Sequence, residues 1–347
     1  MVIVLVIISL SILILAHELG HFLAAKFFKV RVDEFGLGFP PKVIGKKIGE
    51  TTYSVNALPF GGFVKIHGED GMPSETTNPR SLDAQSLLRK SIIVLAGVFM
   101  NIVFGWIVLS GVFMIGAPEH LIIADVAPES PAFGAGLTSG DVILKVTSGG
   151  VSLSDPIISN TFIELVKGAG GRVIALDVRR GKEKVSVSVS GRENPPAGQG
   201  SLGISLVEIG FTRMSFFAAV AKGFTATGEM LFLVAKSFGE LFTRAFYDIS
   251  VFKTISGPVG IVAIAASTSS LGLVYLMQLM ALISLNLAVL NLIPFPALDG
   301  GRFIFLLIEK LKGSPISRKF QIAVNGIGFA LLLALMVVVT VQDIGRL

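Results

Sequence analysis

The chain contains no cysteine and few charged residues. Of its 347 residues, 15% are charged and 52% are hydrophobic, whereas soluble domains carry about 25% charged residues. Without cysteine, disulfide bonds and thiolate metal ligands are excluded. The low charge, together with a mean hydropathy of +0.77, predicts an integral membrane protein that has room for one additional folded domain.

Histidine is also scarce, and the basic runs are short. The chain has four histidines and a formal net charge of +5. Such a charge suits loops beside a membrane, and no basic run is long enough to indicate nucleic acid binding. We therefore expect a lipid bilayer as the surrounding partner, and no nucleic acid partner.

Long apolar runs are what the sequence does have. The first run lacks a basic start and a small-residue cleavage site before His17, so a cleaved signal peptide explains it poorly. Residues 211–250 mix apolar and charged residues, which predicts an amphipathic helix that lies on a surface. Four runs are long enough to span a bilayer, at about residues 2–28, 91–116, 271–293 and 321–342.

Two histidines and a glutamate interrupt the first of these runs. Residues 2–16 carry no charge before His17, Glu18 and His21, and an ionisable group at membrane depth costs about 3 kcal/mol. On a helix, His17 and His21 lie one turn apart and can bind one metal ion. Glu18 beside them can act as a general base toward water on the metal. The alternative is an unused set on a helix surface, but nothing in so apolar a run would solvate it.

A catalytic zinc ion usually takes three protein ligands, so one more is needed. His67 and His120 lie in polar or boundary segments, which is typical of surface histidines. Asp299 instead follows 28 uncharged residues, with two prolines before it and two glycines after it. Irregular backbone at membrane depth is tolerated only within protein or beside water. The alternative is that Asp299 caps a short cytoplasmic helix, but beside an incomplete metal site we expect a ligand.

Two further segments are predicted to contain strands. Residues 31–69 are rich in glycine and proline and alternate in polarity, which predicts a β-hairpin that dips into the membrane edge or stays in the cytoplasm. Residues 117–191 predict a compact unit, with strands near 121–127, 141–146, 172–180 and 184–190 and a helix near 161–167.

These motifs together resemble those of the site-2 protease family of intramembrane zinc metalloproteases, most closely the RseP-type bacterial regulators. His-Glu-Leu-Gly-His at 17–21 and Asn-x-x-Pro-x-Pro-x-Leu-Asp-Gly at 291–300 resemble its two metal motifs. The resemblance covers nearly the whole chain. Relatives often have two tandem PDZ domains, and this chain has room for one. Residues 35–39 and 58–65 resemble the membrane-associated β-loop, 97–101 a pattern in the second helix, and 130–143 the extracytoplasmic PDZ domain.

Hydropathy and resemblance together predict the fold class. We expect an α-helical multi-pass membrane protein with four transmembrane helices, a membrane-associated β-hairpin loop and an inserted α+β PDZ-like domain. The positive-inside rule places the basic loops in the cytoplasm, so both termini and the PDZ-like domain lie outside a bacterial cytoplasmic (inner) membrane. The predicted parts are a first catalytic half at 1–116, the PDZ-like domain at 117–191, a linker with amphipathic helices at 192–270 and a second catalytic half at 271–347.

The resemblance implies regulated intramembrane proteolysis. Zn²⁺ held by His17, His21 and Asp299, with Glu18 as the base, would cleave within or near the membrane segment of a single-pass protein. Such substrates are already trimmed outside the membrane, for example anti-sigma factors or remnant signal peptides.

Further residues are implied to hold the substrate. These are Asn286, Asn291, Gly61 and Gly62, although each asparagine could instead form hydrogen bonds between helices. The PDZ-like domain could bind an extended peptide, screen substrates by size or act as a rigid cap.

Two other classes of function remain open. One is a different membrane metallopeptidase with a cytoplasm-facing motif and a glutamate as third ligand, which fits poorly because Lys26 follows the motif at a distance. The other is a non-proteolytic membrane scaffold that presents the PDZ domain. Glu18 and Asp299 argue against a scaffold, and a zinc assay on the purified protein would distinguish the two.

Overall fold

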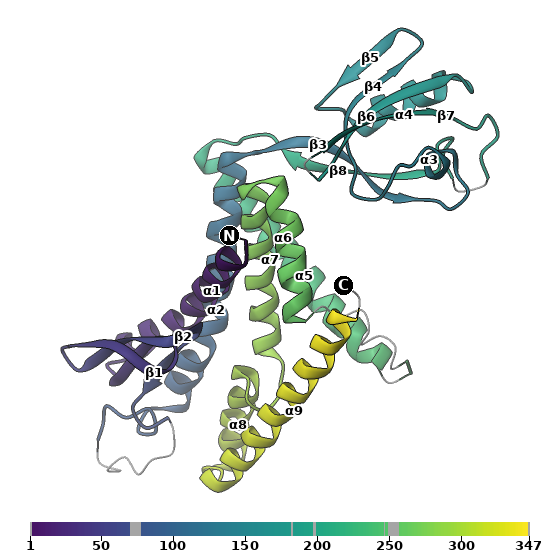
Figure 1. Cartoon of the computed structure of the whole chain (residues 1–347). Coiled ribbons are helices and arrows are strands. Elements are labelled where there is room, and N and C mark those ends of the chain that lie inside the picture. Colours follow the sequence, from purple (N-terminus) through teal and green to yellow (C-terminus); the bar gives the residue numbers. More distant parts are fainter. Residues whose placement is uncertain are drawn as a thin grey trace. The chain divides into compact units, whose positions relative to one another are not determined.

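The computed structural model describes residues 2–69, 78–181, 183–196, 199–245, 247–248 and 257–345. The chain forms two compact units, shown in Figure 1. The helical unit comprises Met1–Gly111 and Val220–Leu347, and the inserted unit comprises Val112–Ala219. The inserted unit therefore interrupts the helical unit in sequence.

The helical unit is built from long apolar helices. Four of them, α1, α2, α7 and α9, occupy the four apolar runs of the sequence. The helices are α1 (Val2–Phe27), α2 (Leu87–Ile115), α5 (Phe216–Ala245), α6 (Pro258–Leu271), α7 (Leu273–Leu292), α8 (Asp299–Lys312) and α9 (Arg318–Ile344).

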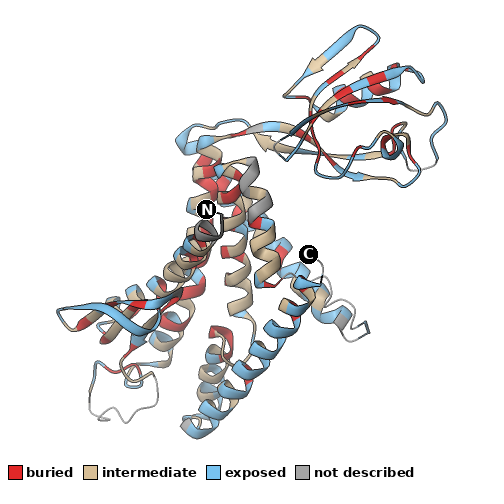
Figure 2. Cartoon of the chain, viewed as in Figure 1, coloured by how far each residue is buried: buried red, intermediate tan, exposed pale blue. Residues whose placement is uncertain are grey.

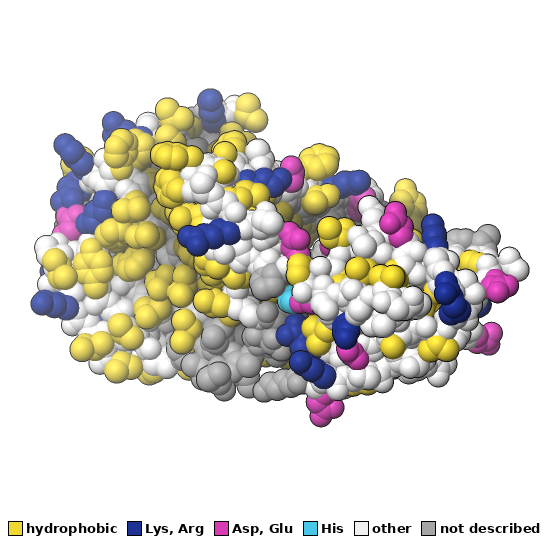
Figure 3. All heavy atoms as spheres, turned by 90° about the horizontal axis from the view of Figure 1, so that it is seen from above, with side chains coloured by type: hydrophobic (Ala, Val, Ile, Leu, Met, Phe, Trp, Pro, Cys, Tyr) yellow, Lys and Arg dark blue, Asp and Glu magenta, His cyan; other side chains and the backbone are white. Residues whose placement is uncertain are grey.

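Five helices in the described part of the chain are long and apolar enough to cross a membrane. Helix α5 is the least apolar of the five, and it lies in the segment for which a surface helix was expected. Figure 3 shows hydrophobic side chains over much of the visible surface, and Phe329 on α9 is 57% exposed. Apolar surface of this extent needs lipid or protein to cover it. The chain is thus a membrane protein, and its helices are consistent with several passes.

Close contacts between helices place α1, α2 and α7 around one site. A β-carbon at Gly20 of α1 would lie 2.3 Å from the Ala96 carbonyl oxygen of α2, so these backbones approach closely. The Ser284 hydroxyl of α7 donates to the Asn101 carbonyl of α2 at 2.9 Å. Both residues are 0% exposed, and this interhelical hydrogen bond fixes α7 against α2.

A long hairpin of β1 (Val32–Ile48) and β2 (Thr51–Ile66) occupies the segment where a hairpin was expected. It curls, because residues 34–37 of β1 pair with both the start and the end of β2, so that Phe35 lies between Tyr53 and Val64. Phe35 lies opposite Val64, and Leu37 lies opposite Gly62. Residues 62–66 form the last row of β2. This row lies beside α1, since a β-carbon at Gly62 would lie 3.8 Å from the Glu18 Cγ.

The inserted unit is an α+β domain with its own core. Its antiparallel sheet has the order β7-β6-β4-β3-β8, and β5 pairs with β4. Figure 2 shows buried positions among the strands and in helix α4. The core includes Phe162 and Ile143. The elements are β3 (Ala117–Val126), α3 (Pro131–Gly134), β4 (Val142–Ser148), β5 (Val151–Ser154), α4 (Ser159–Gly168), β6 (Val173–Arg180), β7 (Glu183–Ser190) and β8 (Ile204–Phe211).

Strand β8 extends this unit beyond residue 191, where the sequence placed its end. It pairs with β3, with Ile123 opposite Leu206. Its partner lies far earlier in the chain, and a glycine- and proline-rich stretch separates β8 from the rest of the domain. Hydropathy along the chain carries no signal for such a distant pairing.

Candidate metal centre

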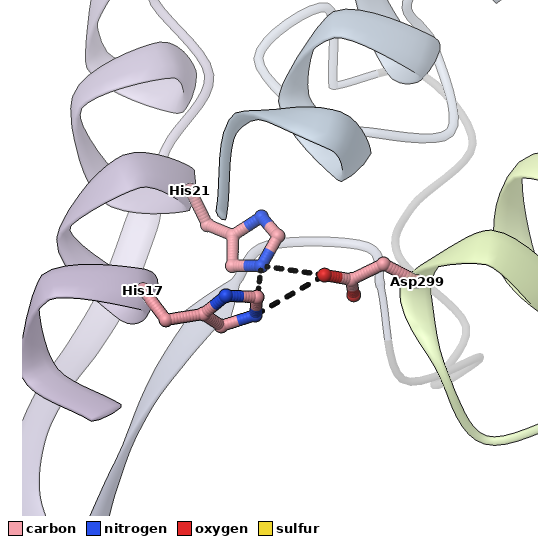
Figure 4. Close-up of side chains that lie close together, drawn as sticks. All are labelled: His17, His21 and Asp299. Atoms are coloured by element: carbon pink, nitrogen blue, oxygen red, sulfur yellow. Dashed lines mark hydrogen bonds and ion pairs between the residues drawn. The ribbon is translucent and has the colours of Figure 1, made fainter. Parts of the chain in front are cut away.

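Three ligand-type side chains from two distant parts of the chain converge in the helical unit. His17 and His21 lie one turn apart on α1, and both point toward Asp299 on α8 (Figure 4). Asp299 Oδ2 lies 3.1 Å from the His17 Nε2 and 3.4 Å from the His21 Nε2. The two Nε2 atoms are 3.2 Å apart. Among the described residues, this is the group of histidines and carboxylates able to hold a metal ion.

The spacing of these three atoms fits zinc. Tetrahedral ligands on bonds of about 2.0–2.1 Å lie about 3.3 Å from one another, close to the 3.1, 3.2 and 3.4 Å found here. Asp299 Oδ2 is also buried, and it has no hydrogen-bond partner of good geometry in the described part of the chain. A buried carboxylate oxygen at this position is stabilised by a cation.

The turn before α8 presents Asp299. Helix α7 ends at Leu292, and Leu298, not Asp299, occupies the N-cap position of α8. Asp299 therefore does not cap the helix, which was the alternative role for it. Ala297 adopts a φ of 74°, and its N–H donates to the Asn325 side chain of α9 at 3.1 Å. This conformation is costly for alanine, so the hydrogen bond helps to hold the turn.

The two glycines after Asp299 allow the turn to pack tightly. A β-carbon at Gly300 would lie 2.3 Å from the Ile293 carbonyl oxygen, and one at Gly301 would lie 2.2 Å from that of Phe295. Real β-carbons do not approach backbone oxygens so closely. The Asp-Gly-Gly sequence thus allows α8 to begin directly against the end of α7.

One face of α2 supports both histidines. The Ile93 carbonyl accepts a hydrogen bond from the His21 Nδ1 at 2.8 Å. The Asn101 amide nitrogen lies 3.2 Å from the His17 Nδ1. Gly97 lies between them in sequence, and positions four residues apart share one face of a helix. A metal-binding histidine commonly uses its second ring nitrogen in this way.

Glu18 lies in a cavity of about 390 Å³ that also contains the three ligands. Its Oε2 accepts a hydrogen bond from the Val64 N–H of β2 at 3.1 Å. The Glu18 carboxylate therefore extends from α1 to the last row of β2. This arrangement places a carboxylate beside the metal site and against a strand edge.

The other expected substrate residues are distributed differently. Asn291 lines the cavity, but the Asn286 side chain donates to the Leu282 carbonyl on its own helix at 2.9 Å. Gly62 lies beside Glu18, whereas Gly61 adopts a φ of 89° and packs against the Phe39 ring. The structure thus brings Asn291 to the cavity, places Gly62 beside Glu18 and pairs Asn286 locally.

The remaining two histidines are paired with carboxylates elsewhere. His67 Nδ1 lies 3.0 Å from Asp33, and His120 Nδ1 lies 2.9 Å from Asp155. Neither pair belongs to the metal group. Both histidines were expected at the surface, and each is instead half-buried against its carboxylate.

Sequence reasoning missed the Arg302–Glu69 ion pair. Both residues line the cavity, and Arg302 Nη1 contacts Glu69 Oε1. Arg302 lies three residues after Asp299, and this helical spacing was a usable signal. Glu69 follows β2, and its place in the site depends on the fold of the hairpin. Arg302 adds a positive charge to a cavity that otherwise contains the carboxylates of Glu18, Asp299 and Glu69.

Comparisons with known proteins agree with this geometry. The sequence pattern of peptidase family M50 matches residues 5–335. A Clostridium perfringens protein whose name classes it with the zinc metalloproteases is 36% identical over 346 residues, covering 99% of this chain and 98% of its own. The zinc metalloprotease RasP of Geobacillus kaustophilus is 26% identical, covering 96% and 95%. The chloroplastic membrane metalloprotease ARASP of Arabidopsis thaliana is 30% identical, covering 95% and 76%.

Proposed function

This chain belongs to peptidase family M50, the site-2 protease family of zinc metalloproteases, and we propose that it cleaves peptide bonds within or near the membrane segments of single-pass proteins. The observation that carries the proposal is the convergence of His17, His21 and Asp299 beside Glu18. The first two are on a membrane-type helix. Family membership also favours an enzyme over the non-proteolytic scaffold.

The residues of this cavity suggest how the reaction proceeds. His17, His21 and Asp299 would hold zinc, which when bound activates water and polarises the peptide carbonyl. Glu18 takes the proton from the attacking water and passes it to the leaving nitrogen. The Val64 N–H holds one oxygen of the Glu18 carboxylate in place. Arg302 lies in the same cavity and balances part of its negative charge.

The last row of β2 is the proposed site for the substrate backbone. The Val64 N–H points to Glu18 and therefore away from its partner strand β1. In a strand, alternate residues direct their backbone groups to the same side, so this row presents donors and acceptors toward the catalytic base. A substrate helix must unwind before its peptide bonds are accessible, and the unwound segment can pair here as an added strand. Asn291 in the cavity is placed to hold its backbone.

We assign four membrane spans, α1, α2, α7 and α9. If α5 also crossed the membrane, the chain would have to cross back to the first side before α7 begins. Helix α6 has 14 residues, which at about 1.5 Å per residue is about 21 Å and too short for a hydrocarbon core of about 30 Å. Helix α5 then lies on the membrane surface without crossing it, and four spans remain. With the basic loops in the cytoplasm, as the positive-inside rule predicts, both termini and the inserted unit lie outside a bacterial cytoplasmic membrane.

The inserted unit is proposed to be PDZ-like and to bind an extended peptide. A cavity of about 710 Å³ lies between helix α4 and strand β8, with Phe162, Val166 and Ile204 in its lining. Strand β8 is at the end of the sheet, so one of its edges is available for strand addition. This groove favours peptide binding over a rigid cap, and a substrate trimmed outside the membrane would supply such an end.

The test is a cleavage assay in membranes with a tagged single-pass substrate whose outer domain has been shortened. Wild type and Glu18→Gln are compared, and mass spectrometry locates the cut. Cleavage within the apolar segment by wild type alone supports the proposal. Cleavage by both proteins would overturn the assigned role of Glu18, and a cut confined to the outer domain would overturn the intramembrane site.

A further inference from the structure

We propose that Asn101 is a positioning residue that fixes His17 as a zinc ligand by accepting a hydrogen bond from its Nδ1–H. The inference rests on the proposed ligand set of the protease. It concerns a side chain on α2 that takes no part in the proposed chemistry. Asn101 also lies outside the two metal motifs of the sequence.

The Asn101 side chain is buried with half of its hydrogen-bonding capacity unused. The residue is 0% exposed. Its Nδ2 lies 3.2 Å from the His17 Nδ1, and its Oδ1 has no hydrogen-bond partner among the described residues. A buried amide oxygen without a donor is energetically unfavourable, so the arrangement needs an explanation.

The chemistry of a metal-bound imidazole supplies the missing donor. Nε2 of His17 faces Asp299 and His21, so it is the nitrogen that would bind zinc. A neutral imidazole that gives Nε2 to a metal carries its proton on Nδ1. Nδ1 is then a donor, and the atom facing it must accept. An asparagine amide exchanges its oxygen and nitrogen by a half-turn about its last side-chain bond. This rotation places Oδ1 against the Nδ1–H, so that the amide oxygen gains a donor and the imidazole gains an acceptor.

The two ligand histidines therefore use different kinds of acceptor. His21 donates to a backbone carbonyl, that of Ile93, at 2.8 Å. His17 faces a side chain, so its partner can be replaced by mutation. The Asn101 main chain is in turn held by Ser284 of α7 at 2.9 Å. This contact involves only the Asn101 main chain, and the side-chain amide faces His17 independently of it.

An amide suits this position better than a carboxylate. A fully buried negative charge on a membrane-type helix is costly, whereas an amide is neutral. An amide also has both a donor and an acceptor. It can donate to the His17 Nδ1 when zinc is absent and accept from it when zinc is bound. His17 is then held in one orientation in both states.

The experiment measures zinc affinity of the full chain, purified in detergent, by competition with a chelator. Asn101→Leu keeps the approximate size and removes the acceptor, and we expect zinc affinity to fall about 10- to 100-fold. Asn101→Asp restores an acceptor and should bind zinc far more tightly than Asn101→Leu. Ser284→Ala is the matched control, because it weakens the same helix contact but keeps the amide. Its zinc affinity should stay close to that of wild type.

Two results would overturn the role of Asn101. One is a zinc affinity of Asn101→Leu equal to that of wild type, and the other is an equal loss of affinity in Asn101→Leu and Ser284→Ala. If Asn101→Leu does not fold, Asn101→Asp is loaded with Co²⁺ and its visible spectrum is compared with that of Co²⁺-loaded wild type. A carboxylate that accepts from Nδ1 makes His17 a more basic ligand, so the two spectra should differ. Identical spectra would overturn the role of Asn101. His17→Ala should lose zinc, and its failure to do so would instead contradict the proposed ligand set.

Discussion

Gly97 of α2 packs directly against His21 of α1. A β-carbon at Gly97 would lie 2.4 Å from the His21 Nε2 and 2.8 Å from the His17 Nε2. These are the two nitrogens that face Asp299. The missing side chain at Gly97 therefore leaves the space in which the two rings stand together, and any larger residue would displace at least one ring.

Replacing Gly97 with alanine should weaken zinc binding while helix α2 remains intact. Alanine favours a helix over glycine by about 1 kcal/mol, so loss of helical structure is not expected. Zinc affinity, measured by competition with a chelator, should fall at least about 10-fold, in the range seen when a supporting residue is lost. Gly111→Ala is the matched control, because its β-carbon would meet only the Met277 Cε at 3.5 Å among the described atoms. Wild-type zinc affinity in Gly97→Ala would show that the rings can shift without cost.

Glu18→Gln should separate zinc binding from catalysis. Glutamine has nearly the same shape and can still meet the Val64 N–H through its amide oxygen, but it cannot take a proton. We expect zinc content to be unchanged and the cleavage rate to fall about 10²- to 10⁴-fold. The rate is measured under single-turnover conditions with excess enzyme. A variant that cleaves within a few-fold of wild type would show that another group is the base.

Removal of the third ligand or of the metal should have parallel effects. Asp299→Ala leaves two histidines, which is one ligand short of the usual catalytic set, so zinc should be lost and cleavage with it. Treating wild type with a chelator should abolish cleavage, and adding zinc should restore it. Asp299→Ala should not recover under the same zinc addition. If it did, Asp299 would not be required to hold the metal.

The sequence predicted the parts of the site that depend on local spacing. His17 and His21 were expected one turn apart, and Asp299 was singled out by the uncharged run before it. The contact between Val64 and Glu18 was not predictable, because it depends on how the hairpin curls back beside α1. The curl arises because one stretch of β1 pairs with both ends of β2, and local alternation of polarity does not indicate such a double pairing.

The Val64 N–H gives a direct test of the hairpin's role. Val64→Pro removes this donor, and proline is tolerated at a strand edge where the N–H faces away from the partner strand. A hydrogen bond to a charged group contributes about 1.5–3 kcal/mol, so cleavage should fall about 10- to 100-fold. Val64→Ala keeps the N–H and is the control for the lost side chain. Equal cleavage rates in the two variants would exclude a role for this donor.

A buried carboxylate in the inserted unit is paired with an exposed arginine, and this pair contributes to the stability of the unit in acid. Asp141 is 0% exposed, and Arg180 on β6 donates to both of its oxygens at 2.8 Å. Burial alone would raise the pKa of the Asp141 carboxyl. The hydrogen bonds from Arg180 and from the Thr138 N–H outweigh burial and hold the pKa below its ordinary value. The folded domain therefore binds this proton less readily than the unfolded chain does.

The sign of this shift predicts how the inserted unit responds to acid. A carboxyl whose pKa is lowered by folding contributes stability above its unfolded pKa of about 3.9, and this stability is lost as the pH falls through the folded pKa. Arg180→Met should destabilise the unit at neutral pH and move the loss of stability in acid to higher pH, because Asp141 is then buried without its partner. Pulse proteolysis of the full chain in urea, at several pH values, measures both effects. Arg179→Met, at the adjacent position on β6, should change neither, and an identical pH profile in wild type and Arg180→Met would contradict the prediction.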